Sequence, residues 1–156
     1  MALELRKTGI RAVGDVPWGT HFCYFYETTQ DLLDTLVPYF TAGLNSKEFC
    51  LWIVSNSELL TLEEAKEALK QAMPELECSL ADGSIEIVGH DEWFRNGGAF
   101  DLHRVANQFK EKVGEAVARG YAGMRVNGSP AWLQKETANS FANSKRMWTS
   151  CSATNP

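Results

Sequence analysis

The chain has 156 residues, 44% of them hydrophobic and 22% charged, which is the size and composition of a single globular domain with a substantial core. Its 15 basic and 20 acidic side chains give a net charge of −5 without any basic stripe, which argues against direct nucleic-acid binding. No apolar run approaches the roughly 20 residues of a membrane span. The N-terminus lacks the apolar region of a signal peptide, so we expect a cytoplasmic protein that does not contact a membrane.

The first half of the chain predicts two strands and two helices in alternation. An apolar run at His21–Tyr26 is predicted as a strand, and a helix over 28–44 follows with apolar residues at helical spacing. Thr28 and Asp31 are placed to cap that helix, and Pro38 is expected to kink or shorten it. The run 49–55 is continuously apolar, as expected for a strand that is buried on both faces.

The second half continues the same alternation. A helix over 61–73 begins with a capping box formed by Thr61 and Glu64. The remaining predicted elements are a strand at 84–89, a loop at 90–100, a helix at 101–120, a strand at 122–128, a partly helical segment at 130–143 and an edge strand at 145–154. This order predicts an α/β fold with a mostly parallel sheet and helices on both faces.

The chain is predicted to form one domain over residues 1–156, with a core at about 13–133 and a polar C-terminal segment at 134–156. Ligands of open parallel sheets bind at the carboxyl ends of the strands. Those ends are predicted at Tyr26–Thr28, Ser55–Asn56, Gly89–Asp91 and Arg125–Asn127.

The sequence lacks the motifs of several enzyme classes. The first strand–helix junction has no phosphate-binding loop of the G-x-x-x-x-G-K-[ST] type. It places Glu27 and Asp31 at the helix N-terminus instead, where carboxylates occupy the positive end of the dipole and repel a polyphosphate. No G-x-G-x-x-G follows a strand and no G-x-S-x-G is present. We therefore expect a non-enzymatic protein that does not bind nucleotides.

The cysteines leave two interpretations open. None of Cys23, Cys50, Cys78 and Cys151 forms a C-x-x-C pair. Buried, reduced thiols are the simpler interpretation for Cys23 and Cys50, because both lie in apolar runs. His21 and Cys23 are two apart on the predicted strand and so share a face, which we expect to be buried and free of metal. The alternative is a zinc- or haem-bound redox sensor that uses His21, Cys23 and Cys50, with His90 nearby.

Arg125 is the charged side chain that most needs a partner. It follows an apolar-leaning stretch near a predicted strand end, where an unpaired charge would pay a large desolvation cost. We predict an ion pair with Glu27 or Asp91, and the alternative is an exposed arginine on a loop.

Five segments in order resemble the MEDS domain, a methanogen/methylotroph sensory domain. They are "HFCYFYET", "VPYFTAGL", "EFCLWIVSN", "GGAFD" and "GYAGMRVNGSPAWL". The resemblance implies a RecA/KaiC-like fold without a working phosphate-binding loop. It also implies a cytoplasmic input domain that senses small hydrocarbon derivatives, such as one-carbon compounds, for a histidine kinase or a DNA-binding output domain in cis or in trans. The family's motif falls on His21, Tyr26, Glu27, Trp52, Gly97, Phe100, Asp101, Gly120, Arg125 and Trp132.

Together these observations predict a concave, mostly aromatic ligand site beneath the loop at 89–98. Its predicted residues are His21, Tyr26, Glu27, Trp52, Asn56, His90, Trp93, Arg125 and Trp132, without metal or cofactor. A third class of function is a degenerate RecA-like scaffold for protein contacts. The sequence does not identify the ligand or the oligomeric state, for which a homodimer is one option. It also leaves open whether the chain is a stand-alone sensor or a fragment of a longer regulator.

Overall fold

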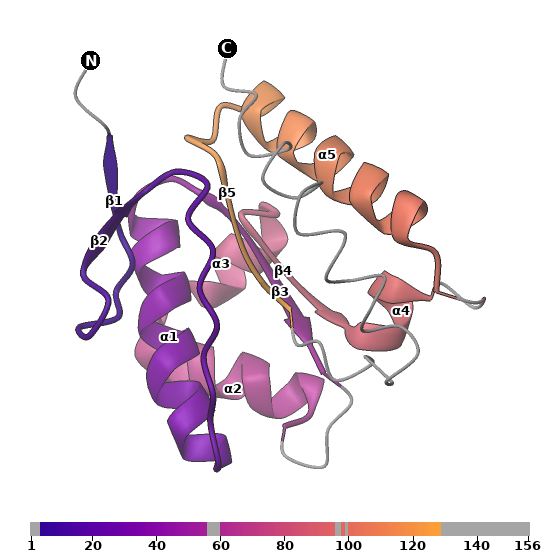
Figure 1. Ribbon diagram of the computed structural model, residues 1–156. Helices are drawn as coiled ribbons and strands as arrows, with labels where there is room; N and C mark the ends of the chain where they lie inside the picture. Colours follow the sequence, from indigo (N-terminus) through magenta and orange to yellow (C-terminus); the bar gives the residue numbers. More distant parts are fainter. Residues whose placement is uncertain (1–3, 56–59, 96–97, 99, 129–156) are drawn as a thin grey trace.

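A computed structural model describes residues 4–55, 60–95, 98 and 100–128 of the chain (Figure 1). Its main sheet has three parallel strands, β3 (Phe49–Val54), β4 (Ile85–Gly89) and β5 (Met124–Gly128), in the order β4-β3-β5. The predicted α/β class and the parallel strand direction are confirmed, and the likeness to RecA and KaiC proteins stays a prediction.

Helices cover both faces of this sheet, and β3 is buried between them. Side chains alternate between the two faces of a strand. Cys50, Trp52 and Val54 pack with α1 (Thr29–Asn45), α2 (Leu62–Ala72) and α3 (Leu76–Ala81). Phe49, Leu51 and Ile53 pack with α4 (His90–Phe94) and α5 (Leu102–Ala118). The continuous apolar sequence of β3 therefore supplies two separate cores.

Both predicted helix caps are confirmed. The Thr28 hydroxyl accepts a hydrogen bond from the Asp31 amide at 3.1 Å, and the Asp31 carboxylate accepts one from the Thr28 amide at 3.0 Å. Thr61 and Glu64 form the same reciprocal pair at 3.2 and 2.8 Å. Two orphan amides at each helix start are satisfied in this way, which fixes where α1 and α2 begin.

Helix α1 continues past Pro38 to Asn45, so this proline does not shorten it. Gly43, which would suit the C-terminal end of a helix, lies inside α1 and is buried. A Cβ at this position would lie 2.8 Å from Cys50 Sγ and 2.9 Å from Arg125 Cδ. Glycine is required here because α1 approaches the sheet too closely for any side chain.

Four short elements were not predicted. An antiparallel hairpin of β1 (Leu5–Lys7) and β2 (Asp15–Pro17) precedes α1, α3 follows α2, and α4 occupies the start of the predicted loop. Elements of three to six residues are too short to show a hydrophobic period.

The predicted strand at 21–26 is wrong. This segment pairs with none of the described strands, and it runs in extended form beside α1 (Figure 1). The Tyr24 hydroxyl donates to the Asp31 carbonyl at 3.1 Å, and Phe22 meets Tyr39 edge-on. Side-chain contacts with α1 thus hold a sequence whose composition is typical of a strand. The predicted elements at 130–143 and 145–154 lie outside the described residues, and among the residues described no helix has the length and apolarity to cross a membrane.

Candidate functional site

A cavity of about 1040 Å³ lies between the extended segment, α1, α5 and the strands β3 and β5. Its walls are mostly apolar, because α1 contributes Leu32 and Leu36, β3 contributes Trp52 and Val54, and α5 contributes Phe109. It reaches Ser55 and Asn127, at the carboxyl ends of β3 and β5. The structure therefore has a large apolar cavity at the edge of the sheet where parallel α/β proteins bind ligands.

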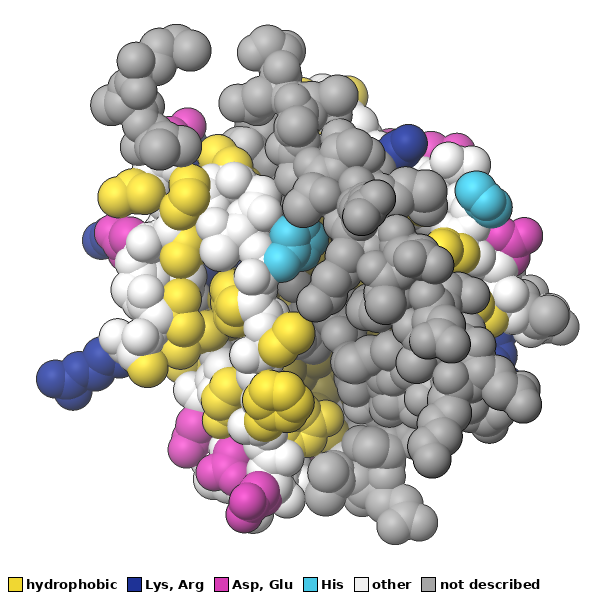
Figure 2. All heavy atoms as spheres, viewed as in Figure 1, with side chains coloured by type: hydrophobic (Ala, Val, Ile, Leu, Met, Phe, Trp, Pro, Cys, Tyr) yellow, Lys and Arg dark blue, Asp and Glu magenta, His cyan; other side chains and the backbone are white. Residues whose placement is uncertain are grey.

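Aromatic side chains of residues 22–26 form the outer wall of this cavity. The rings of Tyr24 and Tyr26 stack at 6.2 Å, and Phe22 packs against Tyr39 at 5.8 Å. Phe25 is 92% exposed, and hydrophobic side chains gather on this face of the molecule in Figure 2. The wall is thus a thin aromatic segment between the cavity and solvent.

The structure places only some of the nine predicted site residues at the cavity. His21, Tyr26, Trp52 and Arg125 line the cavity. Glu27 is exposed and is not among the lining residues. Asn56 and Trp132 lie outside the described residues. Whether any of these residues binds a ligand stays a prediction.

His90 and Trp93 are buried at α4 and are not among the residues that line the cavity. The Trp93 ring packs on Phe109 at 5.2 Å inside the core on the α5 face of the sheet. The predicted aromatic site beneath the 89–98 loop is therefore occupied, in the described part of that loop, by a helical turn that packs into the core.

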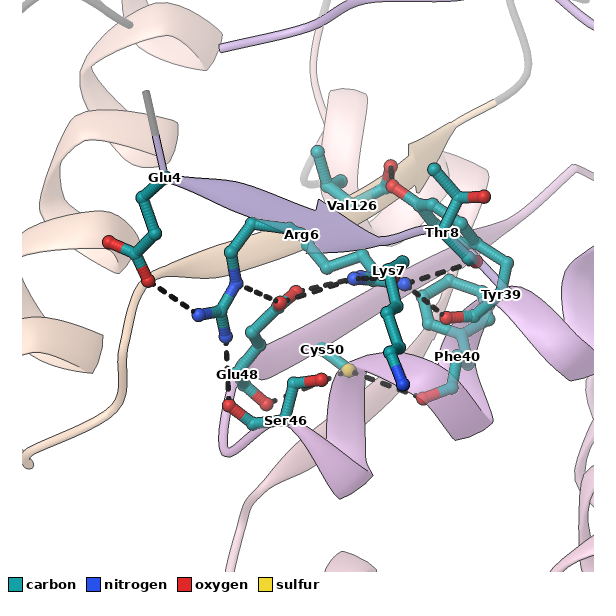
Figure 3. Close-up of polar contacts among 11 residues, drawn as sticks. Glu4, Arg6, Lys7, Thr8, Tyr39, Phe40, Ser46, Glu48, Cys50 and Val126 are labelled. Atoms are coloured by element: carbon teal, nitrogen blue, oxygen red, sulfur yellow. Dashed lines mark hydrogen bonds and ion pairs between the residues drawn. The ribbon is translucent and has the colours of Figure 1, made fainter. Parts of the chain in front are cut away.

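Arg125 pairs with Glu48, and the predicted partners Glu27 and Asp91 are wrong (Figure 3). Nε donates to Glu48 Oε2 at 2.7 Å and Nη2 donates to Oε1 at 3.1 Å. Arg125 is opposite Cys50 in the parallel register, so it lies near the start of β5, next to the residue that precedes β3. Its position within the strand, at the opposite end from the one predicted, explains the partner.

The remaining donors of Arg125 are also used. Nη1 donates to the carbonyls of Tyr39 at 2.6 Å and Thr8 at 3.2 Å, and Nη2 donates to Lys7 at 2.7 Å. A guanidinium has five N–H donors, and the protein takes all five. Arg125 has no donor left for a bound anion.

Arg6 attaches the N-terminal hairpin to the same carboxylate. Its Nε donates to Glu48 Oε1 at 2.9 Å and its Nη2 donates to the Ser46 carbonyl at 2.9 Å (Figure 3). Its guanidinium also lies 4.9 Å from the Trp18 ring centroid. The network of Arg6, Glu48 and Arg125 closes one end of the cavity. Above it, burial raises the pKa of Tyr39 to about 12, so the phenol stays protonated and donates to the Val126 carbonyl at 3.3 Å.

The residues proposed for the alternative metal site are not brought together. His21 and Cys23 are exposed, so the predicted inward-facing pair is wrong, whereas Cys50 is fully buried. Burial raises the pKa of the Cys50 thiol to about 12. The described part of the chain has no group of three or more His, Cys, Asp or Glu side chains placed to hold a metal ion.

The predicted site residues omit two polar lining residues, Thr35 and Ser55, although the sequence places Ser55 at the carboxyl end of a strand. Thr35 lies on α1 and Ser55 follows β3, and both are buried. The available signal was a polar residue on the apolar stripe of α1, three residues after Leu32 and one before Leu36.

Comparison with known proteins agrees with the resemblance seen in the sequence. The family model MEDS, described as "MEthanogen/methylotroph, DcmR Sensory domain", matches residues 20–154. No curated protein and no solved structure matches the chain. Because the family model covers most of its length, the chain belongs to the MEDS family of sensory domains.

Proposed function

We propose that this protein is a non-enzymatic, cytoplasmic input domain that binds a small hydrocarbon derivative, such as a one-carbon compound, in the cavity beside β5. The observation that carries the proposal is the cavity itself, about 1040 Å³ and lined largely by apolar aliphatic and aromatic side chains. Ligand sites for small organic molecules are concave and mostly apolar, with few polar groups. Membership of a sensory family and the presence of such a cavity both support a role in binding a small ligand.

The electrostatics favour a neutral ligand over a nucleotide. The guanidinium of Arg125 is fully hydrogen-bonded within the protein. The first turn of α1 carries the Asp31 carboxylate, whose pKa is lowered by its hydrogen bonds with Thr28. A negative charge in this position opposes phosphate binding. Ligand binding would then be signalled to a histidine kinase or a DNA-binding output domain, in cis or in trans.

Binding should be weak, because a small ligand gains at most about 1.5 kcal/mol for each non-hydrogen atom. A ligand of three or four such atoms then has a dissociation constant in roughly the micromolar to millimolar range.

The test is a ligand-observed NMR screen of one- to three-carbon alcohols, amines, thiols and halides. Tyr26→Ala, which opens the aromatic wall, should weaken every hit. Tyr121→Ala is the matched control, because Tyr121 is also half-buried but lies outside the cavity, beside Phe49 and Arg119. Hits that Tyr26→Ala and Tyr121→Ala affect equally would place binding elsewhere. A screen without hits would favour the contact scaffold, for which the exposed Phe25 is the available surface.

A further inference from the structure

The buried polar side chains that line the cavity fall into two groups. Thr8, Glu48 and Arg125 all have partners within the protein. The Thr8 hydroxyl, for example, donates to the Gly14 carbonyl at 2.6 Å and accepts from the Ile10 amide at 3.0 Å. Thr35 and Ser55, which are 8% and 7% exposed, have no side-chain hydrogen bond with any described residue.

The contrast between Thr35 and Thr41 shows that this is unusual for the helix. A threonine in a helix normally donates its hydroxyl to the carbonyl four residues earlier. Thr41 does so, with its Oγ1 2.8 Å from the Val37 carbonyl oxygen, and Thr41 does not line the cavity. Thr35 lies in the same helix and faces the cavity without that bond.

The surroundings of these hydroxyls are apolar and uncharged. Leu32 and Leu36 flank Thr35 on the buried face of α1, and Trp52, Val54 and Leu60 pack in the same core. Arg125 and Glu48, which also line the cavity, are paired with each other. Lys110 lies on the α5 side and is exposed. Neither hydroxyl oxygen is among the fully enclosed side-chain atoms without a partner in the described residues, so both are open to a molecule in the cavity.

We propose that the Thr35 and Ser55 hydroxyls supply hydrogen bonds to the ligand and make the cavity selective for a neutral molecule with a hydroxyl or carbonyl oxygen. The carbon chain of that molecule packs on Leu32, Leu36 and Trp52. A halocarbon of the same size leaves both hydroxyls unpaired, and a carboxylate brings a charge that no free cation in this part of the wall compensates. This inference rests on the proposed function, which it deepens by naming the ligand chemistry.

The experiment measures 1-propanol, 1-chloropropane and propionate binding by saturation-transfer NMR. Wild-type protein should prefer 1-propanol to both others. Thr35→Val and Ser55→Ala should each weaken 1-propanol binding by roughly tenfold, the loss expected for one hydrogen bond. Binding of 1-chloropropane should stay within about twofold of wild type. Thr41→Val is the matched control, since it removes a hydroxyl from the same helix at a position outside the cavity.

The outcomes separate this inference from the proposed function. Equal binding of 1-propanol and 1-chloropropane, unchanged by both variants, would overturn the hydroxyl pair and leave a purely apolar ligand cavity. Binding of none of the three probes to wild-type protein would overturn both. If circular dichroism shows that Thr35→Val does not fold, Ser55→Ala gives the answer alone, because Ser55 lies after the end of β3 and outside any helix.

Discussion

Arg125 and Glu48, 77 residues apart in sequence, form a two-point ion pair in which the side chains are only 5% and 1% exposed. The pair joins the start of β5 to the residue that precedes β3, and Arg6 adds the N-terminal hairpin to it. Because the guanidinium also bonds to three carbonyls, this network fixes the backbone around one end of the cavity. Its role is structural, and its loss should affect stability before it affects ligand binding.

Replacing Glu48 by Ala should lower the free energy of unfolding by about 3–5 kcal/mol, because it leaves two arginines without their buried counter-charge. Urea denaturation followed by tryptophan fluorescence measures the change. The control is Glu77→Ala, whose partner Lys70 is also exposed, and which should change the free energy of unfolding far less because solvent screens the pair. Similar losses in the two variants would contradict the assigned role of the buried pair.

Arg6→Ala should act more locally. It removes three hydrogen bonds and the contact with Trp18, but Arg125 stays paired with Glu48. Hydrogen exchange should therefore become faster in β1 and β2 while the amides of β3 keep their protection. Faster exchange throughout the sheet would show that the hairpin supports the whole fold.

The sequence predicted the long elements well for a physical reason. α1, α2 and α5 have one apolar stripe each, and two of them begin with reciprocal caps. β3 is buried on both faces and lacks any polar alternation. Local sequence determines these features, so they can be predicted without tertiary information.

The segment 21–26 and the partner of Arg125 depend on tertiary contacts, and both predictions failed. Strand propensity reflects packing on a sheet more than an intrinsic backbone preference, and residues 22–24 pack on α1 instead. The pairing of Arg125 follows from strand register, which places it opposite Cys50. No spacing in the sequence gives that register. The cavity likewise exists only once α1, β5 and the extended segment are assembled.

The cysteines should differ sharply in reactivity. Burial raises the pKa of the Cys50 thiol to about 12, whereas Cys23 and Cys78 are exposed. At pH 8, iodoacetamide followed by mass spectrometry should find Cys23 and Cys78 modified and Cys50 protected, since the thiolate is the reactive species. Denatured protein is the control, in which Cys50 should react as well. Equal rates for Cys50 and Cys23 in folded protein would contradict the buried position.

The same thiol predicts the behaviour at high pH. The folded state keeps the Cys50 proton up to about pH 12, and the unfolded state releases it near 9. The stability that this group contributes is therefore complete below about pH 9 and decreases as the pH rises toward 12. Cys50→Ala should show a shallower decline of unfolding free energy in that window, measured by urea titration at each pH. An identical slope in both proteins would remove Cys50 as the cause.

Acid should destabilise the helix starts. Hydrogen bonds with Thr61 lower the pKa of Glu64, and the bond from the Thr61 backbone amide contributes more than the one from its side chain. A lowered carboxyl pKa gives stability that is present above the unfolded value of 4.5 and is lost as pH falls through the folded value. Glu64→Gln keeps a hydrogen-bond acceptor without the titration, so its melting temperature should depend less on pH below about 4.5. Lys66→Gln, two residues further into α2, should retain the wild-type dependence.

The protein should not bind Mg-ATP. A phosphate at a helix N-terminus needs free amides and a nearby cation. At α1 the Asp31 carboxylate accepts from the amides of Thr28 at 3.0 Å and Glu27 at 3.4 Å, while the Thr28 hydroxyl accepts from the Asp31 amide. The stretch from Thr20 to Thr29 contains neither lysine nor glycine.

Isothermal titration with Mg-ATP tests this directly, and the expected result is no heat of binding up to millimolar nucleotide. Asp31→Asn removes the repelling charge and keeps a capping side chain. It therefore separates the effect of the carboxylate from the effect of the missing lysine and glycine loop. We expect this variant to bind no better, because the missing lysine and glycine loop supply most of the phosphate affinity in nucleotide-binding folds. If Asp31→Asn gained measurable affinity, the carboxylate alone would be what excludes nucleotide from α1. Micromolar affinity in the wild-type protein would contradict the assignment of a neutral ligand.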